Sequence, residues 1–317
     1  MTIDVIIPAY KPGTKFIKLL QSLAAQDTVL GKIIVINTEE MYWPQDLREQ
    51  IGDKAASLLE VHHISKEEFD HGATRNAGVS YSDADIVVLM TDDAVPYDNS
   101  LIGELASVFS DDRVGAAYAR QLASDDASLS EKFSREFNYP DEPSVKGYDD
   151  LKRLGIKTFF CSNVCAAYRH NLFDKLGGFV DCAIFNEDMI FASKIIDNGY
   201  LICYCNKASV IHSHSYTNKE QLHRNFDIAV SQTMNPEVFD RVSSESEGLR
   251  YIFKAMGYFA KAGRPLAVVP FMVTSVYKLY GYKMGKKYKS LSHERILKLT
   301  MNPRFFLNLW DKEEKGR

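Results

Sequence analysis

Asp92 and Asp93 are adjacent carboxylates in the segment TDDAVP at residues 91–96, directly after the apolar run DIVVLM at residues 85–90. Carboxylate oxygens at the end of a strand suit a hard cation such as Mg²⁺ or Mn²⁺, and the oxygens of a diphosphate can complete its coordination. A solvated turn capped by aspartate explains the same residues without a ligand. This motif alone leaves both interpretations open.

A second acidic pair, Glu187 and Asp188, opens a predicted helix in FNEDMIFASKIIDNG at residues 185–199. Acidic residues in a first helical turn are favoured by the helix dipole and can simply stabilise that end. A carboxylate that faces a crevice can also accept the proton of a hydroxyl as a general base. The spacing is compatible with either role.

His212 and His214 form the motif HSH directly after the strand-like segment ASVI. On an extended backbone, residues two apart point to the same side, so the two imidazoles can act together. Imidazole nitrogen is a common metal ligand, although a hydrogen-bonded pair in a loop is the commoner arrangement. The metal interpretation therefore depends on the pair lying beside Asp93.

The segment FDHGATRNAG at residues 69–78 follows a predicted strand and opens a helix. Gly72 permits close backbone approach, and Arg75 and Asn76 fall in the first turns. A helix N-terminus with a guanidinium can bind an anion or the carbonyl edge of a base. A glycine-punctuated turn from strand to helix is the alternative.

Five short β-branched runs, separated by segments with helical periodicity, must position these side chains. The runs cover residues 3–7, 32–36, 58–64, 85–90 and 114–119. Apolar residues at helical spacing mark residues 15–25 and 99–109. This alternation predicts an α/β domain with a parallel sheet and right-handed crossovers, whose ligands bind beyond the carboxyl ends of the strands.

The second half of the chain gives weaker signals. Residues 122–157 are rich in loop-forming residues and are interpreted as a lid that lies over the edge of the sheet. We then expect a strand pair at residues 158–161 and 164–168, a helix at 186–198, and a strand near 200–205. From about residue 220 the pattern is helical.

Composition indicates one large domain with a smaller attachment, because the 317 residues are 45% apolar and 25% charged. The net charge of −4 conceals an asymmetry: residues 250–317 hold 15 Lys and Arg against 4 Asp and Glu, a net +11, whereas residues 1–249 carry −15. A basic tail suits nucleic acid, an anionic membrane or an acidic partner. The acidic body argues against nucleic acid, so membrane contact is favoured.

The basic tail alternates lysine with tyrosine and methionine in a predicted helix, which suits an anionic interface. Its lysines are Lys278, Lys283, Lys286, Lys287 and Lys289. A helical subdomain that packs on the core with a solvated basic face explains the pattern equally well.

The five cysteines are odd in number and lack the paired CxxC motifs of a zinc site, so we expect reduced thiols. The N-terminus MTIDVIIPAY has no signal-peptide pattern, and no run reaches the roughly 18 apolar residues that span a bilayer. These features predict a cytoplasmic protein, with peripheral contact at the inner face of the cell membrane as an option.

Six segments occur in the order and spacing of a family 2 glycosyltransferase of the GT-A fold. They are VIIPAYKPG, FDHGATRNAG, LMTDDAVP, SNVCAAYRH, FNEDMIFA and HSHSY. More narrowly, the chain resembles bacterial rhamnosyltransferases that use dTDP-L-rhamnose in cell-envelope polysaccharide synthesis. The resemblance extends through the tail KLYGYKMGKKYKSLS and so covers nearly the whole chain.

This resemblance implies a Rossmann-like, mostly parallel sheet flanked by helices, with a C-terminal helical extension. The catalytic domain would cover residues 1–217, divided into a donor half at 1–120 and an acceptor half at 121–217. Residues 218–317 would form the helical, basic C-terminal region.

The resemblance also assigns the donor site. The nucleotide base would lie over Pro8, Ala9 and Tyr10, near Asn37 and Arg75. Many family members carry aspartate where this chain has Asn37. The other implied donor contacts are Asp70, His71, Gly72, Asn76 and Asp92.

The metal motif of the family is usually Asp-x-Asp, and here Thr91 stands at its first position, Asp92 between and Asp93 as the expected ligand. His214, or His212, would resemble the further ligand that many GT-A enzymes supply late in the domain. The implied cofactor is Mg²⁺ or Mn²⁺.

The implied reaction is a single displacement that inverts the anomeric carbon. Asp188, with Glu187 beside it, aligns with the catalytic base that deprotonates the acceptor hydroxyl. The donor would be a nucleotide-diphosphate sugar, and the acceptor a saccharide, which is lipid-linked if the tail contacts membrane. A homodimer is compatible with all of this.

Three other functions compete with rhamnosyl transfer. A family 2 transferase using a UDP-hexose donor would share every motif. A nucleotidyltransferase should carry a glycine-rich basic loop after the first strand, and PAYKPGTK is poor in glycine. A non-catalytic membrane-anchoring module predicts loss of the crevice acids, yet Asp93, Glu187 and Asp188 are present.

Overall fold

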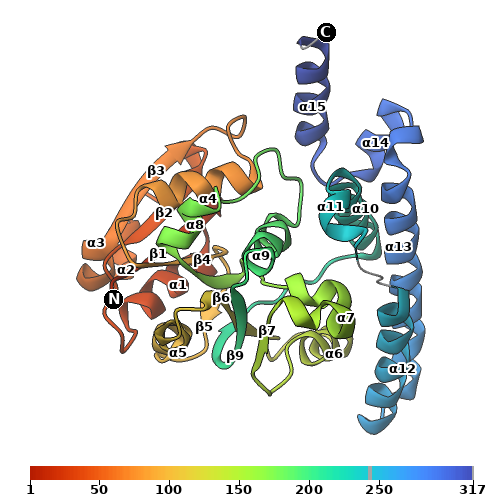
Figure 1. Cartoon of the computed structure of the whole chain (residues 1–317), viewed down its shortest axis with the longest axis horizontal. Helices are drawn as coiled ribbons and strands as arrows, with labels where there is room; N and C mark the ends of the chain where they lie inside the picture. Colours follow the sequence, from red (N-terminus) through yellow and green to blue (C-terminus); the bar gives the residue numbers. More distant parts are fainter. Residues whose placement is uncertain (242–244, 316–317) are drawn as a thin grey trace.

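The computed structural model describes residues 1–241 and 245–315, so residues 242–244 and 316–317 of the predicted basic region lie outside the described residues. A curved sheet flanked by helices occupies one side of the molecule, and a group of long helices from the end of the chain occupies the other (Figure 1). Helix α9 (Glu187–Asp197) lies between the two parts.

Four parallel strands form the first part of the sheet in the order β3-β2-β1-β4. They are β1 (Ile3–Tyr10), β2 (Ile33–Thr38), β3 (Leu59–Ile64) and β4 (Ile86–Met90). Strands β2 and β4 are buried along their whole length, which explains their unbroken Ile and Val runs, because helices cover both faces of a parallel sheet. The predicted α/β fold is confirmed in this part.

The helices that accompany these strands follow the predicted alternation. They are α1 (Thr14–Ala24), α2 (Leu47–Ile51), α3 (Asp53–Leu58), α4 (His71–Ser80) and α5 (Leu101–Ser107). Helix α1 buries its apolar stripe, Phe16, Leu19, Leu20 and Leu23, against the sheet.

The second part of the sheet mixes strand directions. Strand β8 (Cys165–Arg169) runs antiparallel between β4 and β6 (Val114–Leu122), and β9 (Leu201–Ile211) pairs parallel with β6. Two short strands, β5 (Val95–Pro96) and β7 (Ser144–Lys146), pair antiparallel with β9. The chain enters β8 beside the carboxyl end of β4, where Cys165 pairs with Met90, so it must run in the opposite direction.

Two predictions for residues 122–161 are wrong. The expected loop contains helix α6 (Leu129–Asn138) and the short helix α7 (Leu151–Leu154), and the expected strand at 158–161 overlaps a 3₁₀ helix, Gly155–Phe159. Ser128 caps α6 by accepting a hydrogen bond from the Glu131 amide, and Phe133 is buried. Of its charged residues, Glu131 and Arg135 are largely buried and line the cleft described below, whereas Glu136 is exposed.

In the described residues, the remaining α-helices are α8 (His170–Lys175), which precedes α9, and six C-terminal α-helices. The C-terminal helices are α10 (Asn218–Met234), α11 (Pro236–Phe239), α12 (Glu245–Lys261), α13 (Val268–Lys286), α14 (His293–Leu299) and α15 (Pro303–Lys315). Helix α10 begins with a capping box between Thr217 and Glu220. The predicted C-terminal helical extension is therefore present.

Helices α10 and α13 pack at very short range. A Cβ atom on Gly281 would lie 2.1 Å from the Leu222 carbonyl oxygen, and one on Gly285 would lie 2.3 Å from that of Phe226. Only glycine permits this approach. A second contact joins α6 to the same region, because Phe133 packs with Phe259 and Phe271 of α12 and α13.

Among the described residues, no helix combines the length and the apolar character needed to cross a lipid bilayer.

Candidate active site

A large cleft of about 1830 Å³ opens at the carboxyl ends of the sheet strands and extends to the C-terminal helices. Its sheet side includes Tyr10, Asp93 and Asp188, and its helical side includes Arg224 and Lys278. The predicted position of the site, beyond the strand ends, matches this cleft.

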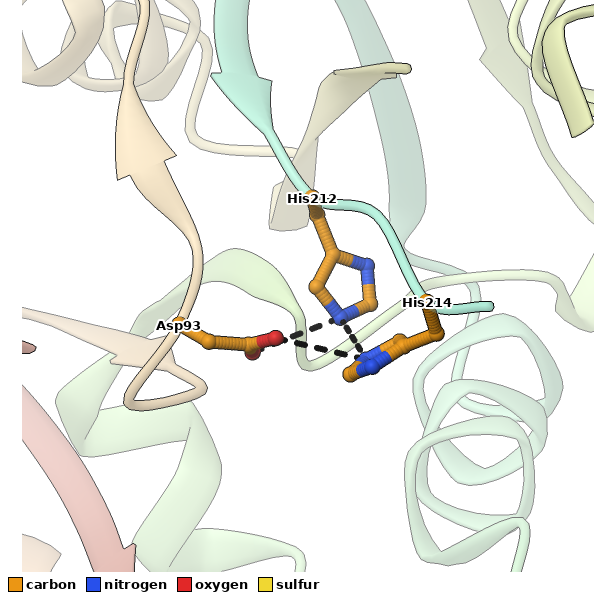
Figure 2. Close-up of side chains that lie close together, drawn as sticks. All are labelled: Asp93, His212 and His214. Carbon is orange, nitrogen blue, oxygen red and sulfur yellow. Dashed lines mark hydrogen bonds and ion pairs between the residues drawn. The ribbon is translucent and has the colours of Figure 1, made fainter. Parts of the chain in front are cut away.

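Asp93, His212 and His214 converge in the cleft (Figure 2). Asp93 follows β4, whereas the two histidines follow β9, and their candidate ligand atoms all lie within 4.8 Å of one another. His212 Nε2 is 3.4 Å from Asp93 Oδ1, and His214 Nε2 is 3.4 Å from Asp93 Oδ2. The condition set by the sequence, that the histidine pair lie beside Asp93, is met.

Buried polar neighbours orient the His212 ring. Its Nδ1 atom lies 3.0 Å from Gln121 Oε1 and 3.3 Å from Arg135 Nη2, and Arg135 also donates to Gln121 Oε1. A hydrogen on Nδ1 directed at the nearer Gln121 acceptor leaves the Nε2 lone pair facing Asp93, as a metal ligand requires. Gln121 itself is held by Tyr139 and Ser162.

Both imidazoles are kept in the neutral, ligating form. Burial lowers the pKa of His212 well below its usual value, and the nearby Arg135 guanidinium lowers it further. Burial also lowers the pKa of His214, although Asp93 acts in the opposite direction. Near neutral pH both rings therefore offer an unprotonated nitrogen.

The donor set fits a divalent cation. The two Nε2 atoms lie 2.7 Å apart, so they either share a hydrogen or face a common ion. One carboxylate and two imidazoles suit a transition ion such as Mn²⁺ better than Mg²⁺, because Mg²⁺ prefers oxygen ligands. Lys15 Nζ lies 4.0 Å from Asp93 Oδ2 and donates to the Ser213 carbonyl, so it supplies a positive charge at the edge of the triad.

Asp92 faces a different neighbour from Asp93. Its Oδ2 atom accepts a hydrogen bond of 3.1 Å from the Tyr10 amide, which ties the end of β1 to the segment after β4. Burial raises the pKa of Asp92 to about 6, and the adjacent Asp93 contributes to the same shift.

Glu187 and Asp188 share the start of α9 but differ in surroundings. Glu187 is buried and lies 3.3 Å from Arg75 Nη1 and 3.3 Å from Asn163 Nδ2. Burial alone would raise the pKa of Glu187, but Arg75 and His71 outweigh it and the pKa is lowered. Glu187 is thus a fixed negative charge that holds Arg75.

Asp188 is only half-buried and lines the cleft. Its Oδ2 atom accepts from the Asn163 amide at 3.2 Å, and its Oδ1 atom accepts from the Met189 amide at 2.7 Å. Burial raises the pKa of Asp188 to about 7, and the charge on Glu187 adds to the effect. A carboxylate with a pKa near neutrality is suited to exchange a proton with a hydroxyl.

The residues predicted around the start of α4 divide into two groups. Asp70, His71 and Arg75 line the cleft. Asp70 Oδ1 caps the helix by accepting from the Gly72 and Ala73 amides, both at 2.9 Å, and Arg75 Nη1 donates to the His71 carbonyl at 2.8 Å.

Gly72 and Asn76 face protein instead. A Cβ atom on Gly72 would lie 1.9 Å from the Val180 carbonyl oxygen, so this glycine admits a neighbouring loop rather than a ligand. Asn76 uses both ends of its amide on the backbone of Phe179, at 2.9 and 3.0 Å. Both residues hold the loop that leads to α9.

Pro8, Ala9 and Asn37 are not among the residues that line the cleft, whereas their neighbours Tyr10 and Thr38 are. Ala9 and Asn37 are buried. The Asn37 amide lies 3.0 Å from His63 Nδ1 and 3.2 Å from the Glu39 carbonyl. Tyr10 is partly exposed and packs edge-on against Tyr42.

Three buried polar atoms on the cleft wall have no hydrogen-bond partner in the part of the chain that the structure describes. They are Thr38 Oγ1, Arg75 Nε and Thr91 Oγ1. Buried polar groups are nearly always paired in folded proteins. Their grouping on the sheet side of the cleft indicates a polar ligand there.

Sequence reasoning did not find Gln121, Arg135, Asn163 or Arg224, which also line the cleft. A signal existed for Arg135, because SLSE at 128–131 has the spacing of a capping box and apolar residues follow at helical spacing. No local signal marks Gln121 or Asn163, since each acts by contacting a residue from a distant segment.

A triad that could hold a metal ion, a carboxyl group with a pKa of about 7 and a cleft at the strand ends together suit an enzyme that acts on a polar, anionic substrate. The model of the glycosyl transferase family 2 matches residues 4–177. The chain belongs to this family of glycosyltransferases.

Two relatives are similar along nearly their whole length. The O-antigen chain rhamnosyltransferase RfbN of Salmonella typhimurium (strain LT2) is 34% identical over 315 residues, which cover 98% of this chain and 97% of the relative. The O-antigen chain rhamnosyltransferase WbaN of Salmonella anatum is 34% identical over 307 residues, covering 96% and 95%.

Similar solved structures include the mannosyltransferase PcManGT from Pyrobaculum calidifontis in complex with GDP-Man and Mn²⁺, with a TM-score of 0.55 and 16% identity, covering 98% of this chain and 87% of that one. TarS of S. aureus, residues 1–349, gives a TM-score of 0.52 at 17% identity and covers 92% of both chains. The predicted GT-A fold is confirmed.

Proposed function

We propose that this glycosyltransferase transfers L-rhamnose from dTDP-L-rhamnose to a saccharide acceptor, with inversion, during assembly of a bacterial cell-envelope polysaccharide. The observation that carries the reaction type is the presence of the Asp93–His212–His214 triad and Asp188 in one cleft. The rhamnosyl donor is supported by the two Salmonella relatives.

The sheet side of the cleft would bind the donor. The unpaired polar atoms of Thr38, Arg75 and Thr91 supply donors and acceptors, and the partly exposed Tyr10 ring offers a surface for the base. Asp93, His212 and His214 would hold a divalent cation, with Mn²⁺ preferred to Mg²⁺. Such a cation would neutralise the charge that grows on the departing diphosphate.

Asp188 would act as the general base. Its carboxylate is oriented by the amides of Asn163 and Met189, and it accepts the proton of the acceptor hydroxyl as that oxygen attacks the anomeric carbon. The buried Glu187 keeps Arg75 in place and raises the proton affinity of Asp188.

The helical side of the cleft would receive the acceptor. Thr274, Ser275 and Lys278 of α13 line it together with Tyr251 of α12. Hydroxyl and aromatic groups suit a saccharide, and the Lys278 ammonium group suits an anionic group that links this saccharide to a lipid. We place the reaction in the cytoplasm, at the inner face of the membrane, with a lipid-linked acceptor.

Donor binding and turnover by the purified protein test this function. We expect metal-dependent selectivity for dTDP-rhamnose over UDP-glucose, UDP-galactose and GDP-mannose. Mn²⁺ should support turnover at a lower concentration than Mg²⁺. The variant Asp93→Ala should lose this metal dependence, whereas Asp125→Ala, an exposed acid outside the cleft lining, should keep it.

The alternatives give different results. Selectivity for a UDP-hexose would retain the enzyme class and overturn the rhamnosyl assignment. A wild-type protein that binds no nucleotide sugar, yet folds, would favour the non-catalytic anchoring module.

A further inference from the structure

The outer faces of α12, α13 and the link between them expose many large apolar side chains. We call this surface the hairpin face; its residues are Phe253, Met256, Leu266, Val269, Met272, Val273, Val276, Tyr277, Leu279 and Tyr280. Leu266, in the link, is 82% exposed, Phe253 is 70% exposed and Val276 is 61% exposed. The two helices lie at the edge of the molecule farthest from the sheet (Figure 1).

Helix α13 is apolar on two opposite sides. Its inner side packs through Phe271, Gly281 and Gly285, which are buried. Its outer side carries Val269, Val276 and the other exposed residues at helical spacing. A surface helix of a globular protein normally turns polar residues outward, and a contiguous exposed apolar patch marks an interaction site.

All the charged residues in the part of the chain that carries the hairpin face are basic. Residues 250–293 contain nine Lys and Arg and neither Asp nor Glu. Lys254, Lys261 and Arg264 are exposed beside the apolar residues of α12 and the link, and Lys283 and Lys287 are exposed at the end of α13. The surface therefore combines exposed apolar side chains with positive charge.

This combination selects among possible occupants. A second copy of the chain would bring the same cations against one another, at an electrostatic cost. An anionic lipid bilayer satisfies both features, because its interface accepts apolar side chains and its head groups attract lysine and arginine.

We infer that the hairpin face is a docking surface for an anionic lipid bilayer, with Leu266 and the outer side of α13 in the interface. Lys278, which the sequence had grouped with the membrane-facing lysines, instead lines the cleft, and Tyr288 is buried. In the sequence, the docking surface therefore precedes the lysine cluster of the basic tail.

The position of the hairpin face beside the cleft explains how a lipid-linked acceptor reaches the site. This explanation rests on the proposed function. Thr274, Ser275 and Lys278 line the cleft on one side of α13, and Val269 and Val276 are exposed on the other. The cleft wall would therefore stand about one helix diameter, roughly 10 Å, from the bilayer surface. A head group in the interface can enter the cleft without its lipid leaving the membrane.

Vesicle co-sedimentation of the full-length protein tests the surface without depending on catalysis. Wild type should bind vesicles of phosphatidylcholine with phosphatidylglycerol and bind pure phosphatidylcholine much less. Leu266→Asp and Val276→Asp should each lower partitioning by roughly tenfold, because each removes an apolar side chain from the interface. Lys254→Glu combined with Lys261→Glu should weaken binding to the anionic vesicles alone.

Val29→Asp is the matched control, because Val29 is 89% exposed on the sheet-containing part of the molecule, and its partitioning should equal that of wild type. Each variant should also bind nucleotide sugar as wild type does, which verifies its fold. The inference is overturned if the wild-type protein does not bind anionic vesicles. It is also overturned if Leu266→Asp and Val276→Asp abolish self-association but leave vesicle binding unchanged. Vesicle binding without any nucleotide-sugar binding would instead reject the proposed function and keep the docking surface.

Discussion

The two walls of the cleft are stabilised in different ways. On the sheet wall, Asp93, His212 and Asp188 follow strands or stand at a helix start; hydrogen bonds orient His212 and Asp188, and Asp93 lies within ion-pair distance of both histidines. On the helical wall, Thr274 and Lys278 belong to a helix that reaches the core through the glycine contacts of α10 and α13. Under the proposed function, catalysis therefore depends on hydrogen bonds between separate segments of the sheet wall, whereas acceptor access depends on helix packing.

The sharpest test of the sheet wall is Asp188→Asn. Removing the base should lower kcat by about 10²–10⁴-fold, with donor binding little changed, because the side chain keeps its shape but cannot accept a proton. Steady-state kinetics and donor titration measure the two effects. A kcat within a few-fold of wild type would exclude Asp188 as the base.

Substitutions of Gln121 test whether the orientation of the His212 ring contributes to metal affinity. Gln121→Leu should weaken Mn²⁺ binding by about 10–100-fold, since His212 loses the acceptor that fixes its tautomer. Calorimetric titration of Mn²⁺ measures the affinity. Gln121→Glu retains an acceptor oxygen and should recover most of the binding; equal losses in both variants would contradict this role.

Gly281→Ala tests the helical wall. The new Cβ would meet the Leu222 carbonyl at 2.1 Å, so overpacking should cost about 1–3 kcal/mol of unfolding free energy and exceed the gain in helix propensity of about 1 kcal/mol. Denaturant unfolding measures the change. Gly257→Ala, in open space on α12, is the control and should be neutral or stabilising. We expect KM for the acceptor to rise in Gly281→Ala more than kcat falls.

The smallest expected effect concerns pH. Asp188, with a pKa of about 7, is protonated below that pH and cannot act as a base, so kcat/KM should fall as pH drops through about 7. In Glu187→Gln the neighbouring charge is gone, and the acid limb should move to lower pH. A pH profile of kcat/KM for both proteins measures the shift, and an unmoved limb would show that Glu187 does not act on Asp188.

The sequence was informative where a signal is local. The five β-branched runs predict the strands that share one direction, and the carboxylates after them lie in the cleft. It was uninformative where a role depends on a distant partner. Asn76 resembles a donor contact in its motif, yet Phe179 occupies its amide, and the antiparallel direction of β8 follows from where the chain returns to the sheet.

The Asp93–His212–His214 triad also depends on contacts between distant segments. HSH and Asp93 are separated by more than a hundred residues, so their approach is a property of the sheet, in which two strands, β8 and β6, lie between β4 and β9. The rings alone could be assigned as candidates. The neighbours of the His212 ring are Gln121 at the end of β6 and Arg135 of α6, a helix that the sequence analysis had interpreted as a loop.

Lys15 gives the triad a tethered counter-ion. Its ammonium group lies 4.0 Å from Asp93 and is bonded to the Ser213 carbonyl between the two histidines. A metal ion bound to Asp93 in the proposed site would compete with this ammonium group, and its apparent affinity would then include the free energy of moving Lys15 away. In that case, shortening or neutralising the Lys15 side chain would remove the competitor and raise the apparent metal affinity.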